Sequence, residues 1–429
     1  MARSRRFSPS LHPPRQAEGL TIGVERRTLA IALTAFLAVA LVGGVLAFQV
    51  LRPLPTIAAT SFLPATTRVG ATPPSLPWPT TGSAALAVAG LGTIASHGPQ
   101  TGLPLASTAK IMTALMILDD RPLRLTEQGP LVPVTASDVA TYQAEKNQGQ
   151  SVFPVAAGEQ LSEYQALQAL LIPSGNNIAE LLAVWDAGSS GVFVDKMNAK
   201  ASALHLAQTH YVDSTGLSPL SIGSPQDLIT LAESALKDPV FAEIVAQPEA
   251  TLPVAGRVFN VNAVIGQAGI VGVKTGSSGA AGACLVFAAN VSADNQPAQI
   301  FGAIMGLPTL DDVFTSTTNL LNAVVPALHN ASVLSTNQVI AEYQAPWGDS
   351  ATVFAEQDIN WVVYDGMVLK QRTDVIKIKA PLASGSSVGT LTLDLGEHHA
   401  RLPLRTTEPI FEPDIFWRLI RLRLDRLLQ

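Results

Sequence analysis

The stretch Leu105-Ala106-Ser107-Thr108-Ala109-Lys110-Ile111-Met112-Thr113-Ala114 decides how the rest of the chain is interpreted. Ser107 and Lys110 are three residues apart where a helix is expected to begin, so their side chains share one face. A serine hydroxyl is a weak nucleophile until a base removes its proton. A lysine can be that base when burial or a second cation lowers its pKa. The stretch therefore predicts Ser107 as a nucleophile and Lys110 as its base.

The tetrad Ser-x-x-Lys carries little information alone, because chance gives roughly one in a chain of this size. A second copy, Ser234 to Lys237, occurs before Asp238-Pro239. That copy ends an expected helix and has no supporting motif around it. We interpret it as structural.

Two further elements follow Ser107 in order. Ser174-Gly175-Asn176 comes directly after a helix ended by Pro173, where a hydroxyl can transfer a proton to a leaving amine and an amide can hold substrate. Ser335-Thr336-Asn337 has the same form but falls in an expected linker, and we discount it.

The third element is Lys274-Thr275-Gly276, with Ser277 after it, at the end of the apolar run 270–273. A strand that presents a cation and a hydroxyl beside exposed backbone suits a peptide ending in a carboxylate. Gly276 lets a substrate approach the backbone closely. Ser174 follows Ser107 by 67 residues, and Lys274 follows Ser174 by 100.

The N-terminus predicts a membrane anchor. Residues 28–51 are 24 residues without a charge, which is long enough to span a bilayer as a helix. Six arginines precede this run and only Arg52 follows it closely, so residues 1–27 are predicted to be cytoplasmic and the rest outside the membrane. A cleaved signal peptide is the alternative. The Pro-rich segment 52–81 is expected to be an extended spacer.

The remaining chain divides into three expected parts. Residues 82–328 mix helices and strands, with a hairpin at 84–96, helices at 111–119, 162–172 and 178–185, and two strands joined by a turn at Gly276–Gly279. Residues 329–410 read as a small all-β domain with strands at 351–354, 360–364, 374–379 and 388–395. Residues 411–429 predict an amphipathic helix, with Phe416, Trp417, Ile420, Leu424 and Leu427 on one face. It lies either on a membrane surface or on its own β domain.

Composition excludes several classes of function. Hydrophobic residues make up 47% of the chain and the net charge is −6, which disfavours disorder and nucleic-acid binding. Cys284 is the single cysteine, predicted to be a small buried apolar residue. His398-His399 is expected to be a solvated turn, and His205 and His210 surface residues, so no metal or other cofactor is predicted.

Ser-x-x-Lys, then Ser-x-Asn, then Lys-Thr-Gly is the order found in penicillin-binding proteins and serine β-lactamases. Residues 82–310 resemble the D-alanyl-D-alanine carboxypeptidases of peptidase family S11, the low-molecular-mass penicillin-binding proteins. The matching stretches are Ala106 to Ala114, Leu170 to Asn177, Met197 to Leu204, Ser214 to Leu217, Asn260 to Asn262 and Gly272 to Gly282.

The resemblance implies an α+β DD-peptidase/β-lactamase-like fold, an antiparallel sheet flanked by helices with a helical subdomain. It implies that Ser107 is acylated, that Lys110 is its base, and that Ser174 and Asn176 transfer protons and hold substrate. Lys274 and Thr275 would bind the terminal carboxylate, and the backbone N–H groups of Ser107 and Ser277 would form the oxyanion hole. Peptidoglycan stem peptides would be the substrates and β-lactams covalent inhibitors, at the outer face of the cell membrane.

Three positions depart from the family pattern. Asn177 stands where Asp is common, Ala109 where Thr is common, and His205 where Gly is usual. Two other functions remain open at this point. A class A-like β-lactamase needs a glutamate after Ser-x-Asn, and Glu180 is the nearest one. A catalytically degenerate member would bind the wall, or sense β-lactams, without turnover.

Overall fold

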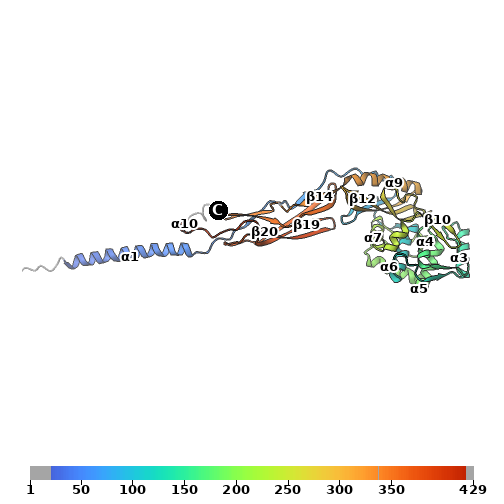
Figure 1. The fold of residues 1–429 in the computed structure, drawn as a ribbon, viewed down its shortest axis with the longest axis horizontal. Coiled ribbons are helices and arrows are strands. Elements are labelled where there is room, and N and C mark those ends of the chain that lie inside the picture. Colours follow the sequence, from blue (N-terminus) through green and yellow to red (C-terminus); the bar gives the residue numbers. More distant parts are fainter. Residues whose placement is uncertain (1–20, 337, 422–429) are drawn as a thin grey trace, which may run out of the picture.

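The computed structural model describes residues 21–336 and 338–421. Three parts follow one another along its longest axis (Figure 1). The helix α1 lies at one end, a β-rich part lies in the middle, and a part with both helices and strands lies at the far end. The unit that carries Ser107 is therefore the part farthest from α1.

The helix α1 spans Thr21–Leu51. Residues 26–51 are long and apolar enough to cross a membrane, with a mean hydropathy of 2.6. Side chains from Arg26 to Phe48 are exposed, so no other described part of the protein covers this stretch, and only the end of the helix, at Gln49, is buried. The expected apolar helix is present, and most of its apolar surface does not pack against the described protein.

A five-stranded antiparallel sheet forms the centre of the far part, in the order β11-β12-β13-β3-β4. Its strands are β3 (Ser83–Val88), β4 (Gly92–His97), β11 (Ile270–Ser278), β12 (Gly282–Ala293) and β13 (Gln296–Leu307). Alternate residues of β12 enter different cores: Cys284 and Val286 face one, and Leu285 and Phe287 face the other. The sheet is thus buried on both faces, and the prediction of a buried Cys284 is confirmed.

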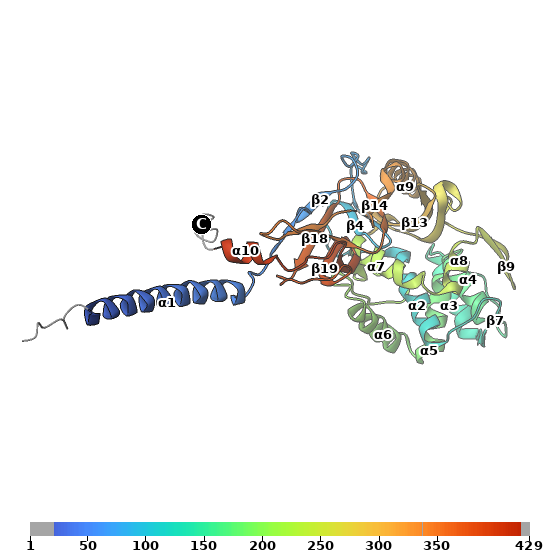
Figure 2. The ribbon, with the colours of Figure 1, turned by 60° about the vertical axis from the view of Figure 1, so that its left-hand side comes forward.

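Seven α-helices belong to the part between β4 and β11. They are α2 (Lys110–Asp120), α3 (Ala136–Asn147), α4 (Glu163–Leu171), α5 (Asn176–Ala187), α6 (Ser190–Ala203), α7 (Pro225–Ala235) and α8 (Pro239–Val245). The short elements among them are β5 (Leu103–Pro104), η1 (Ala106–Ala109), β6 (Leu131–Pro133), β7 (Gln160–Ser162), β8 (Ile222–Gly223), β9 (Glu249–Leu252), β10 (Gly256–Phe259) and η2 (Gln267–Gly269). α7 packs on β13 and β3, and α2 lies at the centre of the helices (Figure 2). Ser162 and Gln165 form the capping box that the sequence predicts for α4.

The opposite face of the sheet is covered by α9 (Leu310–Val324), followed by η3 (Val325–Ala327). The core under α9 is continuous with the core of the β-rich part, because both belong to one buried cluster that runs from Leu320 to Val353 and Leu404. The two parts therefore share apolar packing rather than being joined by a bare linker.

The middle part is built on a seven-stranded antiparallel sheet in the order β1-β15-β16-β20-β19-β18-β2, beside the pair β14-β17. Its strands are β1 (Ala59–Ser61), β2 (Thr66–Arg68), β14 (Leu328–Leu334), β15 (Ala341–Gln344), β16 (Ser350–Ala355), β17 (Ile359–Tyr364), β18 (Val368–Val375), β19 (Ser387–Leu395) and β20 (His398–Thr406). The all-β region expected after residue 328 is present.

The interpretation of residues 52–81 as a spacer is wrong for much of its length. β1 and β2 pair with β15 and β18 as the two edge strands of the seven-stranded sheet. Ile57 is buried, and Trp78 stacks on His97. The prolines of this segment lie outside β1 and β2. The Pro-rich composition around them therefore concealed two short edge strands.

Three local predictions also need correction. β11 continues to Ser278, so Gly276 lies inside a strand and the turn follows at residues 279–281. β18 ends at Val375, and only Ile378 of the remaining stretch pairs again, as a bridge with Ile57. His398 and His399 begin β20 rather than forming a solvated turn. Ring stacking of His398 on Trp361 favours the strand.

The C-terminal helix α10 spans Ile415–Ile420 and begins with Asp414 as its cap. The predicted helix extended to Gln429, and Leu424 and Leu427 lie outside the described residues. α10 lies beside the end of α1 (Figure 1). The residues that hydrogen-bond across this contact are 368 and 372 positions apart in the sequence. A helix is thus present at 415–420 within the predicted segment 411–429, and it begins after Pro413 rather than at it.

Candidate active site

Ser107 lies in η1, a short 3-10 turn that leads directly into α2. Ala106 has φ 46°, a conformation that costs energy for a residue with a Cβ. Thr108 Oγ1 stabilises the turn by donating to Leu105 O at 2.7 Å. Ser107 is half-buried while its neighbours Ala106 and Thr108 are buried. The strained turn therefore presents the Ser107 hydroxyl at the surface of a closed region.

Lys110 brings the predicted elements together. Its Nζ lies 3.0 Å from Ser107 Oγ, 2.8 Å from Ser174 O and 3.3 Å from Ser174 Oγ. It also donates to Asn176 Oδ1 at 2.5 Å. Lys110 has no exposed surface. One buried amine thus contacts the first two motifs, which are 67 residues apart.

Burial is the main reason that the pKa of Lys110 lies well below its ordinary value, because a charged amine loses its hydration. The nearby Lys274 lowers the pKa of Lys110 further, while Glu145 and Asp213 raise it. A lowered pKa makes the neutral amine, the form that can accept the proton of Ser107, more accessible than in an ordinary lysine.

Ser174 and Asn176 are placed by the break between α4 and α5. Ser174 has φ 65°, and its side chain is almost fully buried. Asn176 is the first residue of α5, and its Nδ2 donates to Gln150 Oε1 at 2.8 Å. Because Pro173 ends the preceding helix, the chain turns here and delivers both side chains to Lys110.

β11 supplies the third motif. Lys274 and Thr275 are both 2% exposed, whereas Ser277 is exposed. Lys274 Nζ donates to Thr275 O at 3.2 Å, and burial lowers the pKa of Lys274 to about 7. Lys274 forms no ion pair with a carboxylate among residues 21–336 and 338–421. A buried cation without a counter-charge is a ready site for an anion.

Gly276 is the point where β11 passes the turn that carries Ser107. A Cβ added at Gly276 would lie 3.1 Å from Ser107 N and 3.1 Å from Leu105 O. Such distances are tighter than ordinary van der Waals contacts, so a larger residue would push β11 away from η1. The glycine therefore lets β11 pass close to the turn that carries Ser107.

Sequence reasoning did not single out Asp213, which orders the loop 213–218 that packs against the turn carrying Ser107. Asp213 accepts hydrogen bonds from the backbone N–H groups of Thr215, Gly216 and Ser218. Gly216 has φ 75°, and a Cβ there would collide with Ala106 O. The Ser-Thr-Gly-Leu resemblance pointed to this loop, but the signal for Asp213, an acidic residue two positions before Thr215, was not used.

A second missed feature is a pair of carboxyl groups on α3 and α5. Glu145 is 6% exposed, and its Oε2 has no hydrogen-bond partner among the described residues. Burial and the neighbouring Glu180 raise the pKa of Glu145 to about 7, while Lys110 opposes this rise. Glu180 is exposed and lines a separate hollow of about 390 Å³ with Asp138 and Asn177. No sequence signal links residues 145 and 180.

The structure thus brings Ser107, Lys110, Ser174, Asn176 and Lys274 to one site, with Thr275, Gly276 and Ser277 along β11. The discounted copies lie elsewhere. Ser234 is on α7, and Ser335 follows β14 in the β-rich part, with Asn337 outside the described residues.

Comparison with known proteins agrees with this arrangement. The model of the D-alanyl-D-alanine carboxypeptidase family, Peptidase S11, matches residues 87–306. D-alanyl-D-alanine carboxypeptidase DacB2 of Mycobacterium tuberculosis is 34% identical over 46% of this chain and 65% of its own length. A D-alanyl-D-alanine endopeptidase of Pseudomonas aeruginosa is 32% identical over 46% of this chain and 63% of its own length. The matched region thus spans just under two thirds of either relative.

A solved structure shares the fold over a longer range. The D-alanyl-D-alanine carboxypeptidase DacD of Francisella tularensis superposes with a TM-score of 0.59 at 19% identity, over 81% of this chain and 97% of that one. The predicted DD-peptidase fold is confirmed. Because the family model matches more than half of the sequence, the chain belongs to the D-alanyl-D-alanine carboxypeptidase family, peptidase S11.

Proposed function

We propose that this protein is a serine-type D-Ala-D-Ala carboxypeptidase that trims peptidoglycan stem peptides through an acyl-enzyme on Ser107. The observation that carries the proposal is the buried Lys110 amine, 3.0 Å from Ser107 Oγ and with Lys274 as its nearest cation. A neutral lysine in this position removes the hydroxyl proton as Ser107 attacks.

Each step has a residue in reach. Ser107 Oγ bonds to the carbonyl carbon of the penultimate D-Ala, and its proton passes to Lys110 Nζ. The C–N bond to the last D-Ala then breaks, and Ser174 relays the proton to the leaving amine, since its Oγ lies 3.3 Å from Lys110 Nζ. Water cleaves the ester and restores the Ser107 hydroxyl. The backbone N–H groups of Ser107 and Ser277 stabilise the oxyanion in this proposal.

Lys274 favours a substrate with a free C-terminus. Its amine is buried and lacks a carboxylate partner among the described residues, so a terminal carboxylate supplies the missing charge. Binding that carboxylate raises the pKa of Lys274 and keeps the ammonium charged. Thr275 adds a hydroxyl next to it. A cross-linked peptide without a free carboxylate at this position would gain less from the same pair.

The direct test is release of free D-Ala from a stem pentapeptide by the full chain in detergent, compared with Ser107→Ala. We expect release by the unmodified protein and none above background by the variant. A fluorescent penicillin should label only the unmodified protein, and the label should persist. Rapid antibiotic hydrolysis would instead indicate a β-lactamase, and absence of both labelling and release would indicate a binding module.

Endopeptidase activity is the second candidate, because several relatives, among them the one from Pseudomonas aeruginosa, bear that name. It uses the same acyl-enzyme but cleaves a D-Ala cross-link. Incubating the protein with a purified cross-linked stem-peptide dimer and counting monomer release separates the two activities. Monomer release at a rate equal to that of D-Ala release would favour the endopeptidase.

We also propose that α1 is an uncleaved anchor, with the catalytic part outside the cytoplasmic membrane. Arg421 donates to the carbonyls of Gln49 and Arg52 at 2.9 and 2.7 Å, and Arg418 donates to Val50 O at 3.1 Å. The last carbonyls of a helix lack partners within it, and these arginines satisfy them. The end of α1 is therefore bonded into the fold, whereas cleavage after α1 would remove the acceptors that Gln49 and Val50 supply.

The same junction supports contact of the C-terminus with lipid. Phe411, Ile415, Phe416 and Ile420 are exposed, and they lie beside the end of the proposed anchor. A short helix with arginines and aromatic residues suits a membrane surface. Single cysteines introduced at Ser10 and Ser137 test the topology. A membrane-impermeant maleimide should label intact cells through position 137 only.

A further inference from the structure

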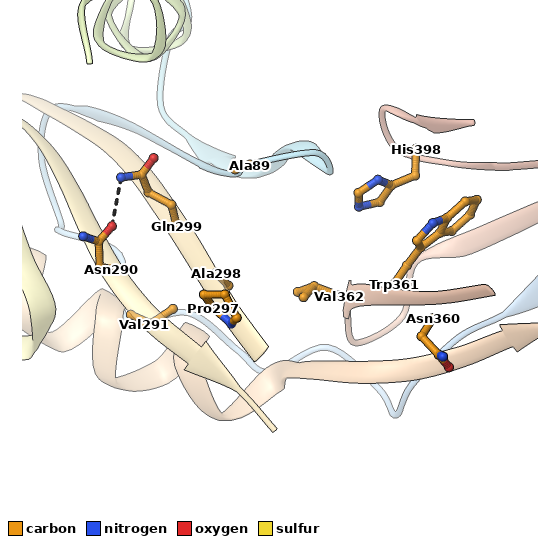
Figure 3. Close-up of a pocket in the computed structure, with 10 residues that line it drawn as sticks. All are labelled: Ala89, Asn290, Val291, Pro297, Ala298, Gln299, Asn360, Trp361, Val362 and His398. Atoms are coloured by element: carbon orange, nitrogen blue, oxygen red, sulfur yellow. Dashed lines mark hydrogen bonds between the residues drawn. The ribbon is translucent and has the colours of Figure 1, made fainter. Parts of the chain in front are cut away.

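A hollow of about 660 Å³ lies between the five-stranded sheet and the β-rich part, away from Ser107 (Figure 3). β12 and β13 supply one wall and β17 and β20 supply the other. Its lining comprises Ala89, Asn290, Val291, Pro297, Ala298, Gln299, Asn360, Trp361, Val362 and His398. Only His398 among these side chains can carry a charge.

One wall of the hollow is an amide pair. Asn290 and Gln299 are directly opposite in the register of β12 and β13, so both side chains leave the same face of the sheet. Gln299 Nε2 donates to Asn290 Oδ1 at 2.9 Å. This bond leaves one whole NH2 group, on Asn290, and one whole carbonyl oxygen, on Gln299, besides the second N–H of Gln299. Reversing both amides would still leave one of each.

The other wall is aromatic. Trp361 and His398 stack with ring centroids 5.1 Å apart and an angle of 18° between the planes. Figure 3 shows this pair across the hollow from Asn290 and Gln299. Burial lowers the pKa of His398, and His399 lowers it further against an opposing effect of Glu397. The ring is therefore neutral near pH 7, and the wall offers flat apolar surface with N–H and N atoms at its edges.

We propose that this hollow binds an uncharged N-acetylated sugar of a polysaccharide. The acetamido group has one N–H donor and one carbonyl acceptor, which match the acceptor left on Gln299 and the donor left on Asn290. The C–H face of the sugar ring packs against the aromatic pair. Phosphates and carboxylates are disfavoured, since the lining contains no lysine or arginine.

The position of the hollow suits a role in the proposed peptidase function, and this part of the inference rests on that function. Gly276 is opposite Cys284 in the sheet, and Asn290 is six residues farther along β12. At the usual rise per strand residue the hollow lies about 20 Å from the peptide site. A glycan that carries peptide branches could occupy both sites at once, whereas a free pentapeptide reaches only Ser107. The hollow would thus raise the effective concentration of peptides attached to glycan.

The direct test is saturation-transfer NMR with the trisaccharide of β-1,4-linked N-acetylglucosamine and the full chain in lipid nanodiscs, which avoids sugar-based detergents. We expect transfer to the acetamido methyl group and to ring protons. Cellotriose, the same trimer with hydroxyl in place of acetamido, should give much weaker transfer. Equal transfer from both trimers, or none from either, would overturn the proposal.

Variants locate the site. Gln299→Ala removes the remaining amide acceptor without touching the core, and we expect affinity about five- to tenfold weaker, as for the loss of one hydrogen bond with good geometry. Trp361→Ala should weaken binding at least as much. Gln357→Ala, an exposed glutamine outside the hollow, is the matched control and should bind like the unmodified protein. Unchanged binding by Gln299→Ala would show that the sugar sits elsewhere.

Measurements on two variants separate the sugar-binding proposal from the proposed peptidase function. Ser107→Ala should retain sugar binding, because Ser107 does not line the hollow. Gln299→Ala should keep its rate of penicillin acylation and its KM for a free pentapeptide, while its KM for peptide attached to glycan rises. If sugar binding persists without D-Ala release, the catalytic proposal fails alone. If D-Ala release persists without sugar binding, the sugar site fails alone.

Discussion

The tetrads Ser107–Lys110 and Ser234–Lys237 have the same spacing but different surroundings. Lys110 has no exposed surface and contacts Ser107, Ser174 and Asn176. Lys237 is exposed and follows the last turn of α7. Lys274 approaches only the first tetrad, where it helps to lower the pKa of Lys110.

The difference shows what makes a lysine a base. An exposed ammonium group is hydrated and keeps its proton. A buried ammonium group loses its hydration, and a second cation nearby repels its charge, so both effects lower its pKa. The tetrad sets only the distance between hydroxyl and amine. The neighbours that remove water and add positive charge come from α5 and β11, far away in the sequence.

The largest expected effect separates the two lysines directly. Lys110→Met keeps the length of the side chain but removes the amine, and we expect acylation of Ser107 by a fluorescent penicillin to slow by about 10³-fold, as for loss of a general base. Lys237→Met should change the rate less than about twofold, because a solvated surface residue is replaced. Stopped-flow labelling measures both rates. A comparable loss in Lys237→Met, with the thermal transition unchanged, would contradict the assignment.

The next effect concerns the second cation. Lys274→Gln should lower kcat/KM for a peptide with a free C-terminus by about 10- to 100-fold, because a charge-assisted hydrogen bond is lost. The same peptide with a C-terminal amide is the matched control, and its kcat/KM should fall far less. Equal losses for the two peptides would mean that Lys274 acts through Lys110 alone and does not bind the carboxylate.

Much of the site could be predicted because the first two motifs lie where helices begin or end and the third lies on an apolar strand. Pro173 ends a helix before Ser174, and an apolar strand precedes Lys274, so both placements follow from local rules. The order of the three motifs then predicted the fold, because it resembles the order found in the penicillin-binding proteins. The hairpin at β3 and β4 and the cap of α4 at Ser162 were also predictable, since turn and capping residues act locally.

The rest depends on contacts between distant segments. The sequence of residues 52–81 predicts a spacer, although it contains the edge strands β1 and β2. Their partners β15 and β18 lie about 280 and 300 residues later, so no local pattern indicates the pairing. Glu145 on α3 and Asp213 in the loop before β8 affect the pKa of Lys110 only because the fold packs these segments near α2. Charge, burial and neighbours are properties of the assembled fold, so a linear pattern does not contain them.

Asn177, where the family commonly has Asp, is explained by this packing. Its Nδ2 donates to Phe153 O at 2.9 Å, and its Oδ1 accepts from Phe153 N at 2.8 Å. Asn177→Asp would lose the donor and add a third carboxylate near Glu145 and Glu180. We expect the free energy of unfolding to fall by about 1–3 kcal/mol at pH 8, as for a buried acceptor left without a donor. Urea denaturation measures it, and a variant as stable as the parent would refute this explanation.

The smallest effect is a shift in pH dependence with opposite signs at two positions. Lys110 must be neutral to accept a proton, so the acid limb of the acylation rate follows its pKa. A charged Glu145 raises the pKa of Lys110, as Asp213 does, and Lys274 lowers it. Glu145→Gln removes one raising charge, so the acid limb should move to lower pH.

Glu180→Gln should move the acid limb the other way. Burial and the neighbouring Glu180 together raise the pKa of Glu145 to about 7, so without Glu180 the Glu145 carboxyl ionises at lower pH and stays charged beside Lys110 over a wider range. The pKa of Lys110 then rises, and the acid limb moves to higher pH. Acylation rates of both variants between pH 5 and 9 test the pair, with Asp138→Asn as a control that lines the same hollow as Glu180. Shifts of the same sign would mean that Glu145 and Glu180 do not act on Lys110 through one another.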